Sequence, residues 1–486
     1  MSQPLGFIIR KRLLTVFLTL KALLAGFVLA VSNALLVMQS AFKYAFSAVM
    51  GIKKTPEVVM WNGFPSVLSV PAKANLDFDF WRKPTYIFPT LKALVSNKTK
   101  KLLLEKRVEI IPDETLYDWI ANGALSRLAV FDGDNISVDL SLITDIEPDS
   151  GAYFTGPIIT VNKHNHKEVK IAFTNGETYG PKDGAFWSLS KLHVQACASF
   201  LLPGSFHGNI HFGLPCVAAA SLYTLDKNSP LYQLFAPHLR FTLRINNEAL
   251  RIQRAQDRSK PYAPFPLTGE AFVESIASDI KKQLMEPGFR CPPWSLENDE
   301  LPFNQYGKAY YHVVRSFVEG VLIKCSQQEL KDWKLFMHSY IPNFEQQNTV
   351  DAVATIIWQV SFLHSADHYG LDKLMQAERY MFYKIQLPEP ALSGLDKETS
   401  DEQVIRRACL TDDRFRSNIF NATFARGHKH PLWSNSMDNI RYKFSDKTLQ
   451  ASAKKFQTEL LETQETLIEQ DMNICPLSNV FQSICW

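Results

Sequence analysis

Residues 351–368 read DAVATIIWQVSFLHSADH, and this stretch is the strongest indication of the fold. Before its first histidine it is apolar around most of a helical circumference, which is typical of a helix that runs through a protein core. His364 and His368 follow at its end. A core helix tolerates such polar groups only when they form hydrogen bonds or bind a metal ion. The sequence therefore predicts a buried helix over 350–369 whose end carries a polar site.

The rest of the chain is predicted to be mainly helical with a minor β element. Further long helices are predicted at 186–201, 307–323 and 447–470. Short alternating runs between 128 and 175, joined by turn signals at DGDN and TNGE, predict a few strands. We expect a hydrophobic helix and a polar, Pro-rich linker within residues 1–75, followed by one large helical domain over 76–486.

The bulk composition excludes several classes of protein. The 486 residues are 46% hydrophobic and 21% charged, which permits a large buried core. A net charge of +3, with no cluster of basic residues of the kind that binds nucleic acid, is too weak a bias to indicate a nucleic-acid partner. The seven cysteines are scattered and odd in number, which argues against a disulfide framework or a zinc knuckle and favours a reducing compartment.

A segment near the N-terminus has the length of a membrane helix. Residues 22–42 contain no charged side chain and follow the basic triplet Arg10, Lys11 and Arg12. As a helix this segment spans about 30 Å, the thickness of a bilayer's hydrocarbon core. Three interpretations remain: a spanning anchor, a helix lying in the interface, or a secretory signal. Length and basic flank favour a membrane-associated protein, whereas basic residues on both sides leave the orientation open.

Two histidine pairs form a candidate metal site. His207 and His211, like His364 and His368, are spaced i, i+4, so each pair projects from one helical face with about 6 Å between side chains. That spacing lets two imidazole nitrogens reach one ion at about 2 Å each. A donor set without cysteine suits iron, manganese or zinc better than a thiolate site. Zinc hydrolysis is disfavoured because HGNIH has no Glu after its first histidine to act as a base.

Four stretches of the chain form a recognisable combination. They are WSLSK at 187–191, HGNIH at 207–211, PLYQLFAPHLRFTLRIN at 230–246 and IIWQVSFLHSADHYG at 356–370. They resemble the W-x-L-x-K helix start, the first histidine pair, the HPIYKLLxPHxRxTxxIN segment and the IIWTxSxxHAAxNFG segment of the lipoxygenase family. The likeness covers roughly residues 110–486.

This resemblance implies a lipoxygenase-like catalytic domain with one non-haem iron ion, manganese being the alternative. Its ligands would be the four paired histidines and the main-chain carboxylate of Trp486, where the family usually has isoleucine. The implied reaction is a dioxygenation, in which hydrogen is abstracted from a polyunsaturated fatty acid or other lipid-like substrate and O2 is inserted. No catalytic side chain is implied beyond the metal centre, and no protein partner is indicated.

The chain departs from the family pattern at several positions. The family spaces its first two ligands H-x4-H on a bulged helix, whereas HGNIH has the spacing of a regular turn. Leu371 stands where the family has a glutamine beside the metal, and Ser229 stands where it has a histidine. Gly269 falls near the small residue that steers oxygen, so Leu371 and Gly269 are expected in the substrate pocket. We expect no counterpart of the family's N-terminal β-barrel domain, with the hydrophobic helix in its place.

Three other functions remain in competition. A lipoxygenase-fold oxidase or desaturase acting on a specialised non-fatty-acid substrate would accommodate Leu371 and Trp486. A membrane-tethered, non-catalytic homologue would keep the fold and bind a lipid or partner. Membrane di-iron desaturases also use HxxxH patterns, but they need more histidines and more spanning helices than this chain offers. The metal content of the purified protein separates the oxidase or desaturase, which needs a metal ion, from the non-catalytic homologue.

Overall fold

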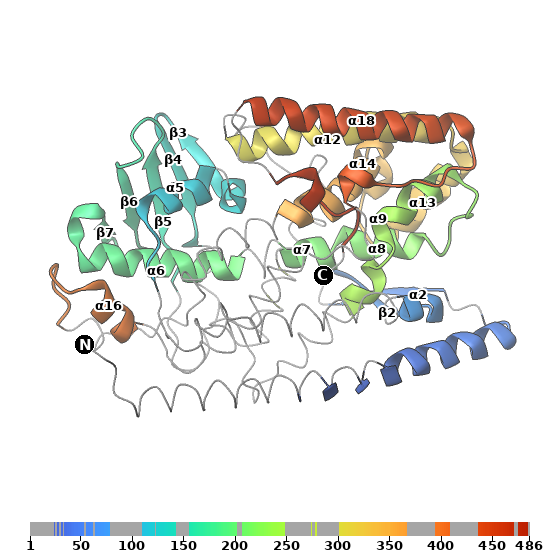
Figure 1. The fold of residues 1–486 in the computed structure, drawn as a ribbon, viewed down its shortest axis with the longest axis horizontal. Coiled ribbons are helices and arrows are strands. Elements are labelled where there is room, and N and C mark those ends of the chain that lie inside the picture. Colours follow the sequence, from blue (N-terminus) through green and yellow to red (C-terminus); the bar gives the residue numbers. More distant parts are fainter. Residues whose placement is uncertain are drawn as a thin grey trace, which may run out of the picture.

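The structure is a computed structural model in which helices surround a buried core and a small sheet lies to one side (Figure 1). It describes residues 24, 27–28, 31–32, 34–52, 55–61, 64–77, 109–121, 123–141, 155–201, 207–247, 274, 278, 301–366, 394–408, 436–470 and 475–484. Within these residues the fold is mainly α with a minor β element, as the sequence predicted.

The strands lie in the first part of the chain, and most of the helices follow them. The strands are β1 (Glu57–Trp61), β2 (Phe64–Ser69), β3 (Ala129–Asp132), β4 (Asn135–Asp139), β5 (Ile158–Asn162), β6 (Val169–Ala172) and β7 (Thr178–Tyr179). The α-helices are α2 (Ala72–Asp77), α5 (Asp113–Ala121), α6 (Ala185–Phe200), α7 (His207–Phe212), α8 (Leu214–Ser221), α9 (Pro230–Leu239), α12 (Pro302–Leu322), α13 (Gln327–His338), α14 (Thr349–Trp358), α16 (Asp401–Ala408) and α18 (Lys447–Glu469). A π-helix, η8 (Gln359–Leu363), continues α14. Short 3-10 helices are η2 (Ala124–Leu128), η4 (Pro181–Asp183), η7 (Phe344–Gln346), η11 (Met437–Asn439) and η12 (Leu477–Asn479).

The predicted strands form one antiparallel meander in the order β3-β4-β5-β6-β7. Alternate residues of β4 and β5, such as Ile136 and Ile159, are buried, while their neighbours face outward. The DGDN turn that joins β3 to β4 contains Gly133 at φ +60°, a backbone conformation that favours glycine. The sheet packs through β6 and β7 against α6, the helix that leads toward the first histidine pair.

A second, two-stranded sheet lies where the sequence predicted a linker. β1 and β2 pair as an antiparallel hairpin, and β2 contacts α7 and α8. The Pro-rich composition of this region favoured an irregular segment. Pairing with a neighbouring strand and packing on buried helices outweighed that local preference, because strand propensity depends strongly on tertiary context.

The long predicted helices are present with slightly different ends. α12 is amphipathic, and it buries one face against α14 and α18 (Figure 1). α14 is buried from Ala352 to Trp358, as expected for a helix that is apolar around its circumference. Gly307 allows α12 to approach α14 closely, since a Cβ atom there would lie 3.3 Å from the indole of Trp358.

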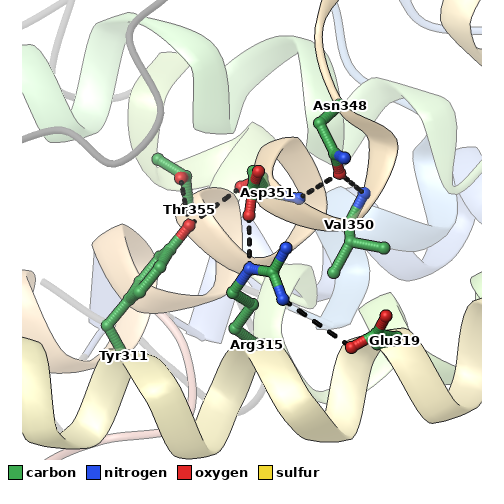
Figure 2. Close-up of polar contacts among 7 residues, drawn as sticks. All are labelled: Tyr311, Arg315, Glu319, Asn348, Val350, Asp351 and Thr355. Carbon is green, nitrogen blue, oxygen red and sulfur yellow. Dashed lines mark hydrogen bonds and ion pairs between the residues drawn. The ribbon is translucent and has the colours of Figure 1, made fainter.

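Several hydrogen bonds and an ion pair hold the N-terminal end of α14 against α12 (Figure 2). Asn348 caps α14 by accepting hydrogen bonds from the backbone N–H groups of Val350 and Asp351. The Asp351 carboxylate accepts a hydrogen bond from Nε of Arg315 on α12 at 2.6 Å. Tyr311, one turn earlier on α12, contacts the Thr355 hydroxyl at 3.4 Å. These contacts fix how far α14 can slide along α12, and so where its far end lies.

We expect Asp351→Asn to lower the free energy of unfolding by about 1–2 kcal/mol. The loss combines an ion pair worth up to about 1 kcal/mol with a further 0.3–1 kcal/mol or so from the carboxylate at a helix N-terminus. The Asp351 and Arg315 side chains are 25% and 35% exposed, so solvent screens part of their attraction. Urea unfolding with an unchanged m-value measures the loss. Glu319→Gln is the matched control, because Glu319 is 3.6 Å from Arg315 and mostly exposed; equal losses in both variants would contradict the prediction.

The expectation of a membrane-associated protein anchored by residues 22–42 is wrong. Residues 34–49 are helical, but no helix within the described residues is both long enough and apolar enough to cross a bilayer. The described helix there, residues 34–49, is shorter than the roughly 20 residues that a bilayer span needs, and it contains Gln39, Ser40 and the charged Lys43.

Candidate metal centre

The structure brings one histidine of each predicted pair together. His211 lies in the last turn of α7 and His364 directly follows the π-helix η8, yet their ring centroids lie 5.4 Å apart with an angle of 63° between the planes. His364 is fully buried and His211 is 5% exposed. The helix α8 contacts both α7 and α14, so its packing brings these two distant parts of the chain to one point.

The stretch HGNIH forms a regular, short α-helix. α7 begins at His207 and ends at Phe212, and Gly213 and Pro215 separate it from α8. The i, i+4 spacing of the first pair is therefore realised on a normal α-turn, although the nearby glycines and proline left this open in the sequence. The irregular, wider turn lies instead in η8, directly before His364.

The π-helix η8 sets the position of His364. The backbone N–H of His364 bonds the carbonyl of Gln359, five residues back, so the helix widens by one residue in this turn. The Ser361 hydroxyl donates to the Ile357 carbonyl inside the same turn. Such single π-turns within α-helices are frequent at functional sites. The sequence pattern of an apolar helix contained no sign of this extra residue.

Asn246 forms a hydrogen bond with the His211 ring. Residues 242–247 are helical, and Oδ1 of Asn246 lies 3.1 Å from Nδ1 of His211, both side chains being buried. With the amide oxygen as acceptor, Nδ1 carries the proton, so a metal ion would be bound through Nε2. A hydrogen-bond acceptor behind the ring is the usual support of a metal-binding histidine, because it fixes both tautomer and orientation.

We expect Asn246→Ala to weaken metal binding by about 10–100-fold, the usual cost of removing such a support. Without the amide oxygen the His211 ring can rotate and exchange its tautomer. Asn246→Asp keeps an acceptor oxygen at the same position and should retain most of the affinity. Competition against a chelator of known strength measures both variants. An alanine variant that binds the metal as tightly as the wild type would show that the hydrogen bond has no such role.

The other predicted site residues remain predictions. The side chain of His207 and all of His368, Trp486, Leu371 and Gly269 lie outside the described part of the structure. Among the described side chains, no group of three or more His, Cys, Asp or Glu is placed to hold a metal ion. His211 and His364 are therefore the two members of the expected ligand set whose side chains are placed.

The tryptophan motif at 187–191 has a structural role. The indole N–H of Trp187 and the ammonium group of Lys191 both donate to Oδ1 of Asp113, at 3.0 and 2.7 Å. Lys191 is almost fully buried, so the pair links α6 firmly to α5. The motif therefore positions the helix that precedes the candidate centre and contributes no ligand to it.

His238, in the third stretch of the resemblance, is a functional candidate that sequence reasoning missed. It lies on α9, is fully buried, and contacts the Gln482 carbonyl through Nδ1 and the Tyr442 hydroxyl through Nε2, each at 2.7 Å. Burial lowers the pKa of His238 to about 4, although the bond to the Gln482 carbonyl opposes that shift. The imidazole is therefore neutral near pH 7. Its position in an otherwise apolar helix was the available sequence signal, but its partners lie more than two hundred residues away.

Comparison with known proteins agrees with this fold. No family model matches the chain. A chloroplastic lipoxygenase 2.2 from barley (Hordeum vulgare) is 23% identical over 254 residues, which cover 44% of this chain and 27% of the barley protein. The match therefore spans only about a quarter of the length of that relative.

Solved lipoxygenase structures match a much larger share of the chain. A coral 8R-lipoxygenase superposes with a TM-score of 0.65 at 12% identity, over 90% of this chain and 78% of the coral chain. A lipoxygenase crystallised anaerobically in complex with arachidonate gives a TM-score of 0.63 at 11% identity, over 94% of this chain and 82% of its own. At such identities the likeness concerns the fold. The chain therefore has a lipoxygenase-like fold.

Proposed function

We propose that this protein is a lipoxygenase-like non-haem iron dioxygenase that oxidises a polyunsaturated fatty acid or a similar lipid by hydrogen abstraction and O2 insertion. One observation carries the proposal: His211 and His364 are buried, and their ring centroids lie 5.4 Å apart although they come from two different helices of a lipoxygenase-like fold. Buried histidines that meet across helices in this way are a typical arrangement for binding one metal ion.

The donors present fit a single first-row metal ion. An imidazole nitrogen binds such an ion at about 2 Å, so two rings whose centroids are 5.4 Å apart can each direct a nitrogen at a common point. Neutral imidazoles suit iron and also other first-row ions, with manganese the main alternative. We further propose that His207, His368 and the main-chain carboxylate of Trp486 complete the ligand set.

The chain's own residues hold and shield the site. A bound iron ion would supply one-electron chemistry toward a weak C–H bond and O2. Asn246 accepts a hydrogen bond from Nδ1 of His211, which fixes the tautomer and the orientation of the ring. The ring of Phe212 is buried and lies 6.1 Å from that of His211, so water is excluded from that side of the site. No side-chain acid or base is needed for this chemistry.

A lipid substrate is the substrate class that the fold favours. The arachidonate in one of the matched structures belongs to that lipoxygenase, and we extend the class of ligand to this chain as part of the proposal. A specialised substrate that is not a fatty acid remains the alternative, because Leu371 departs from the family pattern.

Oxygen uptake by iron-loaded protein tests the proposal. With linoleate or arachidonate, the wild type should consume O2 and form hydroperoxides that contain a conjugated diene, identified by absorbance and mass spectrometry. The His211→Ala variant should show neither. Stoichiometric iron without oxidation of either fatty acid would reject the substrate class and favour the oxidase alternative. Protein that binds neither iron nor manganese would reject the dioxygenase and favour a non-catalytic homologue.

A further inference from the structure

A segment close to the end of the chain is held against the helix that carries His364. The backbone N–H of Phe481 donates to the hydroxyl of Ser365, the residue next to His364, at 2.9 Å. On its other side the same segment is paired with residues near η11, where the Met437 N–H donates to the Val480 carbonyl at 2.7 Å. Residues 480–484, which we call the strap, thus cross directly beside the candidate metal centre.

His238 fixes the strap from a third direction. A carbonyl oxygen can only accept, so Nδ1 of His238 must donate to the Gln482 carbonyl, and Nε2 of the neutral ring then accepts from the Tyr442 hydroxyl. Tyr442 keeps its proton, because burial raises the pKa of its phenol well above the ordinary value. The tautomer of His238 is therefore determined by its two partners.

The two anchors, Ser365 and His238, bind backbone groups of neighbouring residues in the strap. Ser365 binds the N–H of Phe481 and His238 binds the carbonyl of Gln482, so the short stretch of backbone between them is held at both ends. Ser365 follows η8, and α9, which carries His238, contacts η8. A displacement of the strap would consequently pull on the turn that orients His364. Trp486, the proposed further ligand, follows Gln482 by four residues, so the same anchor limits where it can reach.

We propose that His238 is a positioning residue for the metal centre, and that it acts by holding the Gln482 carbonyl so that the strap stays fixed beside His364. This inference rests on the proposed function of the site. The bond that matters is the one made by Nδ1 to the Gln482 carbonyl, whereas the Tyr442 hydroxyl only satisfies the other ring nitrogen.

A pair of near-isosteric variants separates the two ring nitrogens. In His238→Asn the side-chain amide N–H lies where Nδ1 was, so a donor to Gln482 is kept. In His238→Gln the amide lies where Nε2 was, so that donor is lost. Tyr442→Phe removes only the contact at Nε2 and serves as the matched control. Two quantities are measured on the full chain: amide hydrogen exchange of residues 480–484, and the dissociation constant for iron by chelator competition.

We expect the asparagine and Tyr442→Phe variants to keep both exchange protection and iron affinity near wild-type values. The glutamine variant should lose protection of the strap and bind iron about tenfold or more weakly, the usual cost of removing an outer support of a metal site. Unchanged protection in the glutamine variant would overturn the proposal, as would lost protection with an unchanged dissociation constant. The exchange measurement needs no metal and tests the anchor directly. A wild-type protein that binds no iron would instead reject the proposed function of the site.

Discussion

Replacing His364 with alanine should reduce bound iron from one ion per chain to a small fraction of that amount. His364 is fully buried and its ring faces His211, so its loss removes a direct ligand of the proposed centre. Removing only an outer support costs about 10–100-fold in affinity, and a direct ligand should cost more. Oxygen uptake with a polyunsaturated fatty acid should be lost together with the metal.

The measurement is elemental analysis of protein purified in the presence of iron, followed by oxygen uptake. Because a cavity in the core could unfold the chain, His364→Gln is measured in parallel as a near-isosteric replacement. His312→Ala, on the exposed side of α12, is the control histidine and should retain its iron. Iron that stays stoichiometric in both folded His364 variants would exclude this residue as a ligand, and the proposed centre with it.

Replacing Phe362 with alanine should lower the free energy of unfolding by about 3–5 kcal/mol. Phe362 is fully buried in the π-helix η8, and its ring stacks on Tyr310 of α12 with centroids 4.9 Å apart. The loss combines the transfer of a phenyl ring with the cavity that it leaves. A domain is stabilised by only about 5–15 kcal/mol, so this one substitution removes a large share.

Phe456→Ala on α18 is the matched control for Phe362→Ala. Phe456 is equally buried and stacks on Phe317 with centroids 4.4 Å apart, but it lies outside the π-turn. Urea unfolding should show similar losses of stability in the two variants. The variant at Phe362 should also weaken iron binding, because η8 orients His364, whereas the variant at Phe456 should not. A loss below about 1 kcal/mol at Phe362 would show that the turn does not depend on this stacking.

Local patterns predicted the helices well because they are properties of short segments. The long helix predicted at 447–470 was found at Lys447–Glu469, and the buried helix predicted from 350 begins at Thr349 and continues through η8 to residue 366, where the described residues end. The alternating runs between 128 and 175 likewise became strands. Hydrogen bonds within a helix connect residues four apart, and side chains alternate across a strand, so both signals can be seen within about ten residues.

Local patterns failed where the outcome depended on distant partners or on the surroundings. The segment at 22–42 has the length of a membrane helix, but no helix among the described residues is both long enough and apolar enough to cross a bilayer. The hairpin of β1 and β2 was missed because its strands are stabilised by each other and by α8. The supporting roles of Asn246 and His238 were missed because their partners are remote in the sequence.

The sequence by itself indicated which residues could bind a metal, and the i, i+4 spacing in HGNIH and HSADH predicted that each pair shares one helical face, since spacing is a local property. The resemblance carried by four separated stretches also indicated the fold. Only the tertiary structure decided that His211 meets His364, that a π-turn precedes the latter, and that the strap crosses beside it. These arrangements arise from the packing of α7 and α14 on α8 and from hydrogen bonds between remote segments. No short window of sequence contains both partners of such contacts, so their geometry exists only once the core has formed.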